Sequence, residues 1–270
     1  MSIKLFVTDL DGTLLVSAST VSKRNIAAAQ AAAKAGVTVT IATGRMYKAA
    51  LPVAQALGVD VPIITYNGAL IKTTSGKELY AAYLPPEIVA EVASFAQERG
   101  WYIQSYSHDE LLFPVYDEHS RGYEQAQAIK GRLVGWDGLR SPEYTQAVSK
   151  MLCITDDESE TEQRIREFND HFGGRIVAVR SKADYAEITC PGVSKASGIQ
   201  RLAERLGISI DETMAIGDGD NDIPMLKAAG HSVAMGNAVP EVKAICDYVT
   251  GDCEADGFAT AIEKYVLGQG

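Results

Sequence analysis

Two aspartates follow the first mostly apolar run of the chain, in the stretch "LFVTDLDGTLL". Asp9 and Asp11 are two residues apart, and Gly12 and Thr13 come directly after them. A carboxylate taken out of water costs free energy unless something compensates its charge, so apolar runs rarely end in this way. Two carboxylates at one strand end can take different roles, one attacking an electrophile and the other moving a proton. The pair therefore indicates a catalytic site.

Other polar residues stand at the ends of further apolar runs or at the start of a helix. They are Thr43, Gly44 and Arg45 in "ATGR", Asn67 and Gly68 in "YNGAL", Lys195 in "GVSK", and Asp218, Asp220, Asn221 and Asp222 in "GDGDND". Taken singly, most have a structural explanation, such as a helix cap at Thr43 or a turn at Asn67-Gly68. Open parallel sheets, however, gather ligand-binding residues beyond the carboxyl ends of their strands. Several carboxylates, a hydroxyl and an ammonium at one sheet edge are hard to explain by stability alone.

This combination of groups suits phosphoryl transfer. Carboxylates and water are the hard oxygen ligands that Mg²⁺ prefers, and Mg²⁺ commonly partners phosphate. With the metal and Lys195 offsetting negative charge, a phosphoryl group can approach the aspartates. One carboxylate can then form an aspartyl-phosphate, while the other protonates the leaving oxygen and later deprotonates water.

The elements that position these residues are typical of an α/β protein. Short apolar strands alternate with helices at both ends of the chain, which predicts a parallel sheet covered on both faces. The predicted strands are 3–9, 37–44, 61–70, 213–219, 231–236 and 246–250, and the predicted helices are 21–36, 46–58, 194–208, 221–230, 238–245 and 256–268.

The middle of the chain has a different pattern, typical of an α+β module with an antiparallel, partly solvated sheet. In it "WYIQSYS", residues 101–107, alternates like a half-exposed strand. We expect a core domain of residues 1–83 and 188–270, and an inserted domain of residues 84–187. The aromatic residues of the insert are candidates for substrate contact or for its own core: Trp101, Tyr102, Tyr106, Tyr116, Tyr123 and Trp136.

Composition excludes several classes of function. The chain has 270 residues, 46% of them hydrophobic, and a net charge of −10, which disfavours binding to a nucleic-acid backbone. No apolar run approaches the roughly 18 residues that a membrane span needs, and the N-terminus lacks a signal-peptide layout. The four cysteines form no C-x-x-C pair. We therefore expect a cytoplasmic protein with no membrane or nucleic-acid partner, as a monomer or weak homo-oligomer.

Four motifs in order, "DLDGT", "ATGR", the lysine of "GVSK" and "GDGDND", resemble those of the haloacid dehalogenase superfamily of phosphatases. The run "GDGDNDIPMLKAAGHSVAMGNA" is similar to the Cof-type branch, whose large α/β cap is inserted between the second and third motifs. The resemblance spans the whole chain. It implies a Rossmann-like, doubly wound parallel-sheet core and an inserted cap that acts as a lid. It also implies Mg²⁺-dependent hydrolysis of a small phosphomonoester, such as a sugar phosphate.

The resemblance also assigns roles to residues. It makes Asp9 the nucleophile and a metal ligand, and Asp11 the general acid/base that offers its backbone carbonyl to the metal. Asp218 becomes the acidic metal ligand of the last motif, with Asp222 and Asn221 supporting the metal waters or the lysine. The other assignments are phosphate binding by Thr43, Gly44, Asn67 and Lys195, and substrate binding by Gly12, Arg45 and Gly68. Asp220 is not expected to be a ligand.

Two alternatives stay open from the sequence. A phosphomutase or phosphotransferase would use the same machinery, but it would usually need a second phosphate pocket in the cap. The basic residues there are scattered: Arg121, Lys130, Arg132, Lys150 and Arg180. A phospho-accepting signalling domain also uses aspartates, Mg²⁺ and a lysine, but such domains are short, roughly 120 residues, and lack the second carboxylate. The substrate could be a sugar phosphate, pyridoxal phosphate or flavin mononucleotide.

Overall fold

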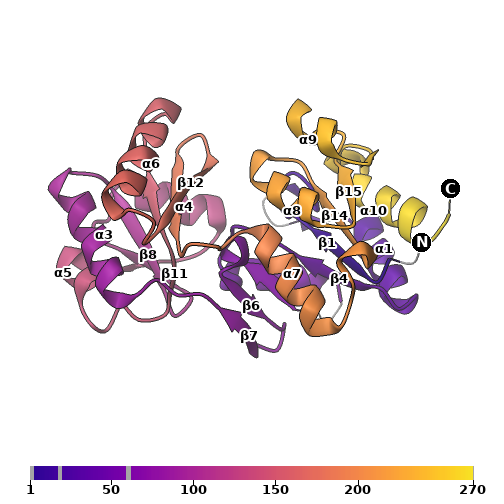
Figure 1. The fold of residues 1–270 in the computed structure, drawn as a ribbon, viewed down its shortest axis with the longest axis horizontal. Helices are drawn as coiled ribbons and strands as arrows, with labels where there is room; N and C mark the ends of the chain where they lie inside the picture. Colours follow the sequence, from indigo (N-terminus) through magenta and orange to yellow (C-terminus); the bar gives the residue numbers. More distant parts are fainter. Residues whose placement is uncertain (1–2, 18–19, 59–61, 270) are drawn as a thin grey trace. The chain divides into compact units, whose positions relative to one another are not determined.

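The computed structural model describes residues 3–17, 20–58 and 62–269. The chain divides into two compact units, a core unit of Met1–Tyr80 with Ser194–Gly270 and an inserted unit of Ala81–Val193 (Figure 1). The limits predicted from the sequence, Leu84 and Glu187, both fall inside the inserted unit. Within the described part of the chain, none of the helices has the length and apolar character that a bilayer crossing requires.

A parallel sheet of five strands forms the centre of the core unit, in the order β16-β15-β14-β1-β4. Its strands are β1 (Leu5–Thr8), β4 (Thr38–Ile41), β14 (Thr213–Gly217), β15 (His231–Ala234) and β16 (Tyr248–Val249). All four residues of β1 are buried, because β14 pairs with one side of the strand and β4 with the other. The strand that precedes the two aspartates therefore lies inside the sheet.

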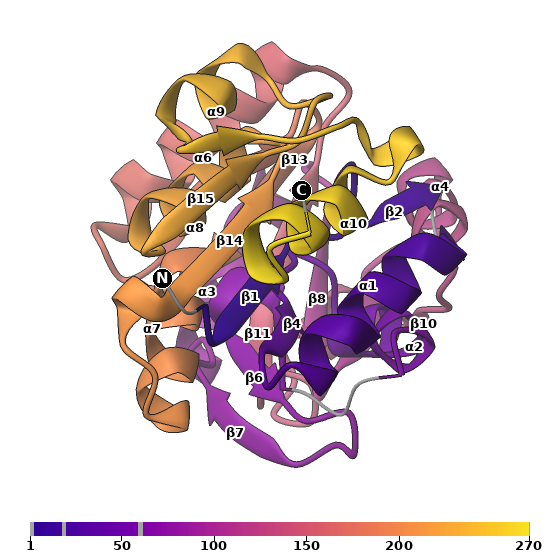
Figure 2. The ribbon, with the colours of Figure 1, turned by 90° about the vertical axis from the view of Figure 1, so that its right-hand side faces the viewer.

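Helices cover both faces of this sheet (Figures 1 and 2). On one side of β1 are α1 (Lys23–Lys34) and α10 (Gly257–Ala261), and on the other α7 (Lys195–Leu206) and α8 (Ile223–Ala228). The core unit also contains α2 (Tyr47–Ala56), α9 (Pro240–Ile245), a π-helical turn at Ile262–Val266 and several short 3-10 turns. The predicted α/β fold with a Rossmann-like core is confirmed.

Local signals explain where the helices begin and end. The Ser22 hydroxyl caps α1 by accepting a hydrogen bond of 3.0 Å from the Asn25 N–H. Ser194 and Ser197 form a reciprocal capping box at the start of α7, and Gly207 ends that helix in the left-handed conformation. Serine is a favoured helix cap and glycine a favoured helix stop, so Ser22 and Gly207 are recognisable in the sequence as a helix start and a helix end.

The strand predicted at 61–70 is placed differently, and its first residue, Val61, lies outside the described residues. β5 (Ile63–Thr65) lies beside β4, and an isolated parallel bridge joins Ile64 to Ala42, the residue after β4. It belongs instead to a three-stranded sheet with β6 (Leu70–Lys72) and β7 (Glu78–Ala81). A tight turn at Tyr66–Gly68 reverses the chain between β5 and β6, which pair antiparallel. A small hairpin of β2 (Leu15–Ser17) and β3 (Thr20–Val21) was also not predicted.

The inserted unit contains a mixed sheet of six strands, in the order β10-β9-β8-β11-β13-β12. Its strands are β8 (Ile103–Ser107), β9 (Glu110–Phe113), β10 (Arg132–Leu133), β11 (Val148–Ile154), β12 (Val177–Lys182) and β13 (Tyr185–Thr189). Its helices are α3 (Pro86–Glu98), α4 (Glu118–Gln127), α5 (Gly135–Arg140) and α6 (Glu158–Phe172). The pairing is antiparallel as predicted, except that β10 runs parallel to β9.

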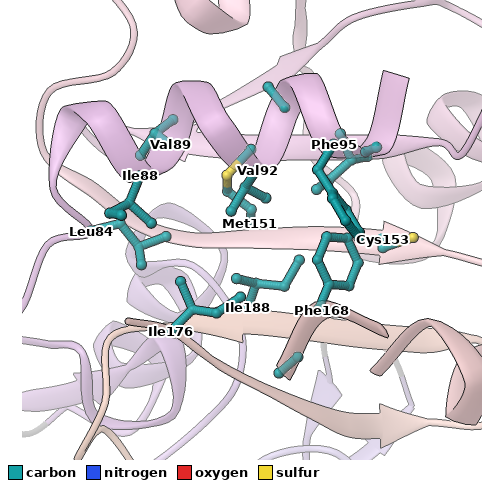
Figure 3. Packing of buried hydrophobic residues seen from close by; sticks show 14 of the residues in the cluster. Leu84, Ile88, Val89, Val92, Phe95, Met151, Cys153, Phe168, Ile176 and Ile188 are labelled. Atoms are coloured by element: carbon teal, nitrogen blue, oxygen red, sulfur yellow. The ribbon is translucent and has the colours of Figure 1, made fainter. Parts of the chain in front are cut away.

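An apolar core joins the sheet of the inserted unit to helices α3, α5 and α6. Figure 3 shows Phe95 of α3 directed towards the sheet, near Cys153 of β11 and Phe168 of α6. The rings of Phe95 and Phe168 lie 5.4 Å apart between centroids. The prediction of a half-exposed strand at 101–107 is wrong, because all five residues of β8 are buried. The Gln104 side chain accepts a hydrogen bond from Tyr102 and donates one to Tyr106, so the buried amide of Gln104 is satisfied by its two tyrosine neighbours.

Candidate active site

The loop after β1 carries Asp9 and Asp11. The Asp9 N–H donates to the Ile216 carbonyl on β14 at 3.1 Å, so the parallel pairing extends to this residue, whose side chain is buried. Gly12 follows with φ +81°, a conformation that favours glycine, and a Cβ at this position would overlap the Asp218 carboxylate. The first motif thus lies directly against the last one.

The loops after β4 and β5 bring Thr43 and Asn67 together. The Asn67 N–H donates to the Thr43 carbonyl at 3.0 Å, and the Thr43 N–H donates to the Ile64 carbonyl at 3.0 Å. Tyr66 and Asn67 both have left-handed backbone conformations, with φ of 52° and 54°. A Cβ at Gly44 would come 3.1 Å from the Asn67 Oδ1 atom, so glycine allows this side chain to lie against the loop. The second motif and the "YNG" turn therefore form one compact structure.

Gly68 places the same turn against the start of α7. Its φ is +102°, and a Cβ there would overlap the backbone carbonyl of Ser194, the residue before Lys195. Glycine at this point allows the turn and the helix start to approach each other. The resemblance placed Gly68 at the substrate, and the structure gives it this packing role.

Lys195 bridges two carboxylates from different loops. Its Nζ atom lies 2.5 Å from Asp9 Oδ1 and 2.5 Å from Asp222 Oδ1, and its side chain is only 1% exposed. The capping box at the start of α7 fixes the backbone from which this side chain extends. A buried lysine of this kind is stable only with compensating charge, which the two aspartates supply.

The loop after β14 supplies Asp218 and Asp222. One oxygen of Asp222 accepts hydrogen bonds from the N–H groups of Asp218 and Gly219, at 3.0 Å and 3.1 Å. The Thr13 hydroxyl donates to Asp218 Oδ1 at 2.6 Å. Asp222 is therefore held by the loop and the lysine, whereas Asp218 is held by the first motif.

Two carboxylates share one ammonium, and this sets the protonation of the site. Burial and the charge of Asp222 raise the pKa of Asp9 to about 8, although Lys195 acts against the shift. Burial lowers the pKa of Lys195, but the charges of Asp222 and Asp9 outweigh it and the net shift is upward. Burial also raises the pKa of Asp218 to about 6, against the Thr13 hydrogen bond. The site consequently has excess negative charge that a proton or a cation would relieve.

Asp11 forms a separate ion pair with Arg45. The Arg45 Nε atom donates to Asp11 Oδ2 at 2.9 Å, and Nη2 donates to Oδ1 at 2.5 Å. The guanidinium side chain is 7% exposed, while the Asp11 side chain is 49% exposed. Such a bidentate pair is among the stronger hydrogen-bonded arrangements in proteins. In this structure both oxygens of Asp11 are thus engaged by the arginine of the second motif.

The donor set fits a hard divalent cation. Carboxylate oxygens of Asp9, Asp218 and Asp222 lie within 4.8 Å of one another. Lys195 contacts one oxygen of Asp9, and Thr13 contacts one oxygen of Asp218, so these two carboxylates each have a second oxygen to offer. Both oxygens of Asp222 already accept hydrogen bonds, one from Lys195 and the other from two loop N–H groups. Oxygen donors of this kind suit Mg²⁺. The side chain of Asp11 is not in this group, and its expected backbone contribution stays a prediction.

The sequence itself places this arrangement in a known family. A family model described as haloacid dehalogenase-like hydrolase matches residues 6–262. The chain belongs to the haloacid dehalogenase-like hydrolases. The expected family and its Cof-type branch are confirmed.

Two relatives that match this hydrolase over nearly their whole length are named as phosphatases. It is 28% identical to the HMP-PP phosphatase of Serratia proteamaculans, covering 97% of this chain and 95% of that protein. It is also 28% identical to a 5-amino-6-(5-phospho-D-ribitylamino)uracil phosphatase of Bacillus subtilis, covering 98% and 99%. These names agree with the expected enzyme class, a phosphoric monoester hydrolase.

Solved structures agree with the fold. A haloacid dehalogenase-like hydrolase from Bacteroides thetaiotaomicron superposes with a TM-score of 0.88 at 31% identity, covering 98% of this chain and 100% of that one. A sugar phosphatase of haloacid dehalogenase subclass IIB superposes with a TM-score of 0.82 at 28% identity, covering 97% and 98%.

The hydrolase brings most of the predicted residues together, and their individual roles stay predictions. Asp220 is exposed and lies outside the carboxylate group, and Asn221 is half-buried beside Gly219. Sequence reasoning missed Thr13, although its place directly after the paired aspartates could have indicated it. It also missed Asn237, whose side-chain amide donates to the Gly12 carbonyl at 2.8 Å.

Proposed function

We propose that this protein is a Mg²⁺-dependent phosphatase that hydrolyses a small phosphorylated metabolite through an aspartyl-phosphate on Asp9. The observation that carries the proposal is the buried Lys195, which lies 2.5 Å from both Asp9 and Asp222. This contact fixes the Asp9 side chain and supplies positive charge where a phosphate would arrive. Hydrolysis of small phosphorylated compounds is also what the names of its relatives describe.

In the first step, an oxygen of Asp9 attacks the phosphorus of the phosphomonoester. The bond between phosphorus and the leaving oxygen breaks, and that oxygen takes a proton from Asp11. Lys195 and the Thr43 hydroxyl stabilise the charge on the transferring group. Because Arg45 engages both oxygens of Asp11 in this structure, proton donation requires this ion pair to open.

In the second step, Asp11 removes a proton from water, and the water oxygen attacks the phosphorus of the aspartyl-phosphate. The bond between phosphorus and Asp9 breaks, which releases inorganic phosphate and restores the carboxylate. Asp9 and Asp218, with the backbone carbonyl of Asp11, would hold Mg²⁺. When bound, the cation neutralises phosphate charge and orients the phosphoryl group. Asp222 keeps Lys195 in place through both steps.

The inserted unit is proposed to act as a lid that excludes water and selects the leaving group. The phosphomutase alternative gains no support from three of the five basic residues considered there. Lys130 pairs with Glu124, Lys150 with Glu187, and Arg180 with Glu158, so these cations already have acidic partners. For the substrate, we favour a sugar phosphate or another small phosphomonoester, as in the subclass IIB sugar phosphatase.

The proposal is tested by phosphate release with Mg²⁺ over a panel of sugar phosphates, pyridoxal phosphate, flavin mononucleotide and HMP-PP. The matched control is Asp9→Asn, which removes the nucleophile while leaving Asp222 to pair with Lys195. We expect release by the wild type alone. With p-nitrophenyl phosphate, whose leaving group departs without a proton from Asp11, we also expect Asp11→Asn to accumulate a peptide containing Asp9 that is heavier by one phosphoryl group. Equal release by the wild type and Asp9→Asn would refute the assignment of the nucleophile.

A further inference from the structure

Asn237 joins three loops at the carboxyl edge of the sheet in the core unit. Its Nδ2 atom donates to the Gly12 carbonyl at 2.8 Å, and its Oδ1 atom accepts from the Cys253 N–H at 2.8 Å. The side chain therefore connects the loop after β15 with the loop after β1 and the loop after β16. An exposed asparagine whose amide is used at both ends is positioned by the fold rather than by solvent.

The loop that carries Asn237 also holds the Asp218 loop. The Val239 N–H donates to the backbone carbonyl of Asp218 at 3.1 Å. Residues 237–239 thus contact both motifs that carry the carboxylates: Gly12 through the Asn237 side chain, and Asp218 through the backbone. The two motifs also meet directly, because Gly12 lies against the Asp218 carboxylate and Thr13 donates to it. A shift of the Gly12 carbonyl would change the distance between Asp9 and Asp218.

We infer that Asn237 is a positioning residue for the cation site, a role that rests on the proposed function. Its side chain hydrogen-bonds to Gly12 and Cys253, and it acts by fixing the Gly12 carbonyl relative to the Asp218 loop. Groups that orient metal ligands in this indirect way typically change metal affinity or activity about 10–100-fold when they are removed. Because Asn237 is exposed, we expect Asn237→Ala to weaken Mg²⁺ binding about tenfold, at the lower end of that range. Turnover should fall while the KM for substrate stays nearly constant.

The experiment measures Mg²⁺ binding by calorimetry without substrate, together with the melting temperature of the metal-free protein. Asn237→Ala is compared with Asn169→Ala in the inserted unit. Asn169 makes an equivalent clip, with its Nδ2 atom donating to the Ala178 carbonyl and its Oδ1 atom accepting from the Ala178 N–H, both at 2.9 Å. We expect the Asn169 variant to melt earlier and to bind Mg²⁺ as the wild type does. A purely structural role for Asn237 would give this same result.

A second variant, Asn237→Asp, separates geometry from charge. It keeps an acceptor for the Cys253 N–H, but it places a carboxylate oxygen against the Gly12 carbonyl. Charge alone would make this variant bind Mg²⁺ more tightly, whereas the positioning role predicts weaker binding. Wild-type Mg²⁺ affinity in Asn237→Ala, or wild-type or tighter affinity in Asn237→Asp, would overturn the inference. If the wild type itself bound no Mg²⁺, the proposed function would fail first and this inference with it.

Discussion

Replacing Lys195 by methionine tests whether the lysine offsets the charge of the buried aspartates. The side chain is 1% exposed and lies 2.5 Å from two carboxylate oxygens, so Lys195→Met leaves Asp9 and Asp222 without a cation. Removing one partner of a buried ion pair costs about 3–5 kcal/mol, because the remaining charge stays out of water. For a folding unit of this size, that loss corresponds to a fall in melting temperature of roughly 6–20 °C.

The assay must report the two units separately, because a chain of two units need not unfold in one step. Both tryptophans, Trp101 and Trp136, lie in the inserted unit, so their fluorescence follows that unit alone. Hydrogen exchange of peptides from β1 and β14 follows the core unit. In Lys195→Met without metal, we expect the opening free energy measured by hydrogen exchange to fall by about 3–5 kcal/mol in β1 and β14. The unfolding transition followed by tryptophan fluorescence should stay at the wild-type temperature.

A matched control is Lys150→Met in the inserted unit. Lys150 is also buried, and its Nζ atom lies 3.1 Å from Glu187 Oε1. This variant should shift the tryptophan transition instead. Mg²⁺ should stabilise Lys195→Met at least as well as the wild type, by about 2.7 kcal/mol at 100 times its dissociation constant, because the cation replaces the lost charge. Unchanged protection of β1 and β14 in metal-free Lys195→Met would refute the reasoning.

Two further predictions concern the cation. Mg²⁺ must displace protons from carboxyl groups whose pKa is raised, to about 8 for Asp9 and about 6 for Asp218, so Mg²⁺ affinity should rise between pH 6 and 8 and level off above. Because the folded pKa of Asp9 exceeds its unfolded value, the metal-free protein should also lose stability over the same rise in pH. Calorimetry in two buffers checks the proton release, and a pH-independent affinity would contradict the first statement. Gly12→Ala should weaken Mg²⁺ binding at least about tenfold, because a Cβ there overlaps the Asp218 carboxylate and φ is +81°. Mg²⁺ binding equal to that of the wild type would contradict this prediction and show that the loop adapts. Gly36→Ala, at another glycine of positive φ with nothing within 4 Å, is its control.

Much of the site could be predicted because parallel strands share one carboxyl edge. Asp9, Thr43 and Asp218 each follow a strand of the parallel sheet, so their proximity follows from strand direction alone. Lys195 could be placed there because the helix predicted at 194–208 puts it at a helix start, where the structure has it. These signals are local, so they can be recognised from neighbouring residues in the sequence.

Other features depend on side chains that meet across the fold, which the sequence does not reveal. The ion pair between Asp11 and Arg45 depends on the rotamers of two side chains from different loops. The burial of β8 was missed because Gln104 reads as a solvent-facing residue, although Tyr102 and Tyr106 satisfy its amide. The "GDGDND" spacing likewise does not say which carboxylate faces the lysine and which faces Thr13. Such choices are settled by tertiary hydrogen bonds.

Because the inserted unit interrupts the core unit, the core cannot be completed until late in synthesis on the ribosome. β1 pairs with β14, and Asp9 meets Lys195 across 186 residues of chain, so the nucleophile loop lacks these partners until most of the protein has been made. The inserted unit, Ala81–Val193, is continuous and is complete before either partner emerges. Until then β1 has only β4 beside it and exposes an unpaired apolar edge that invites aggregation. A chain truncated before β14 should therefore be an aggregating fragment rather than a weakened enzyme.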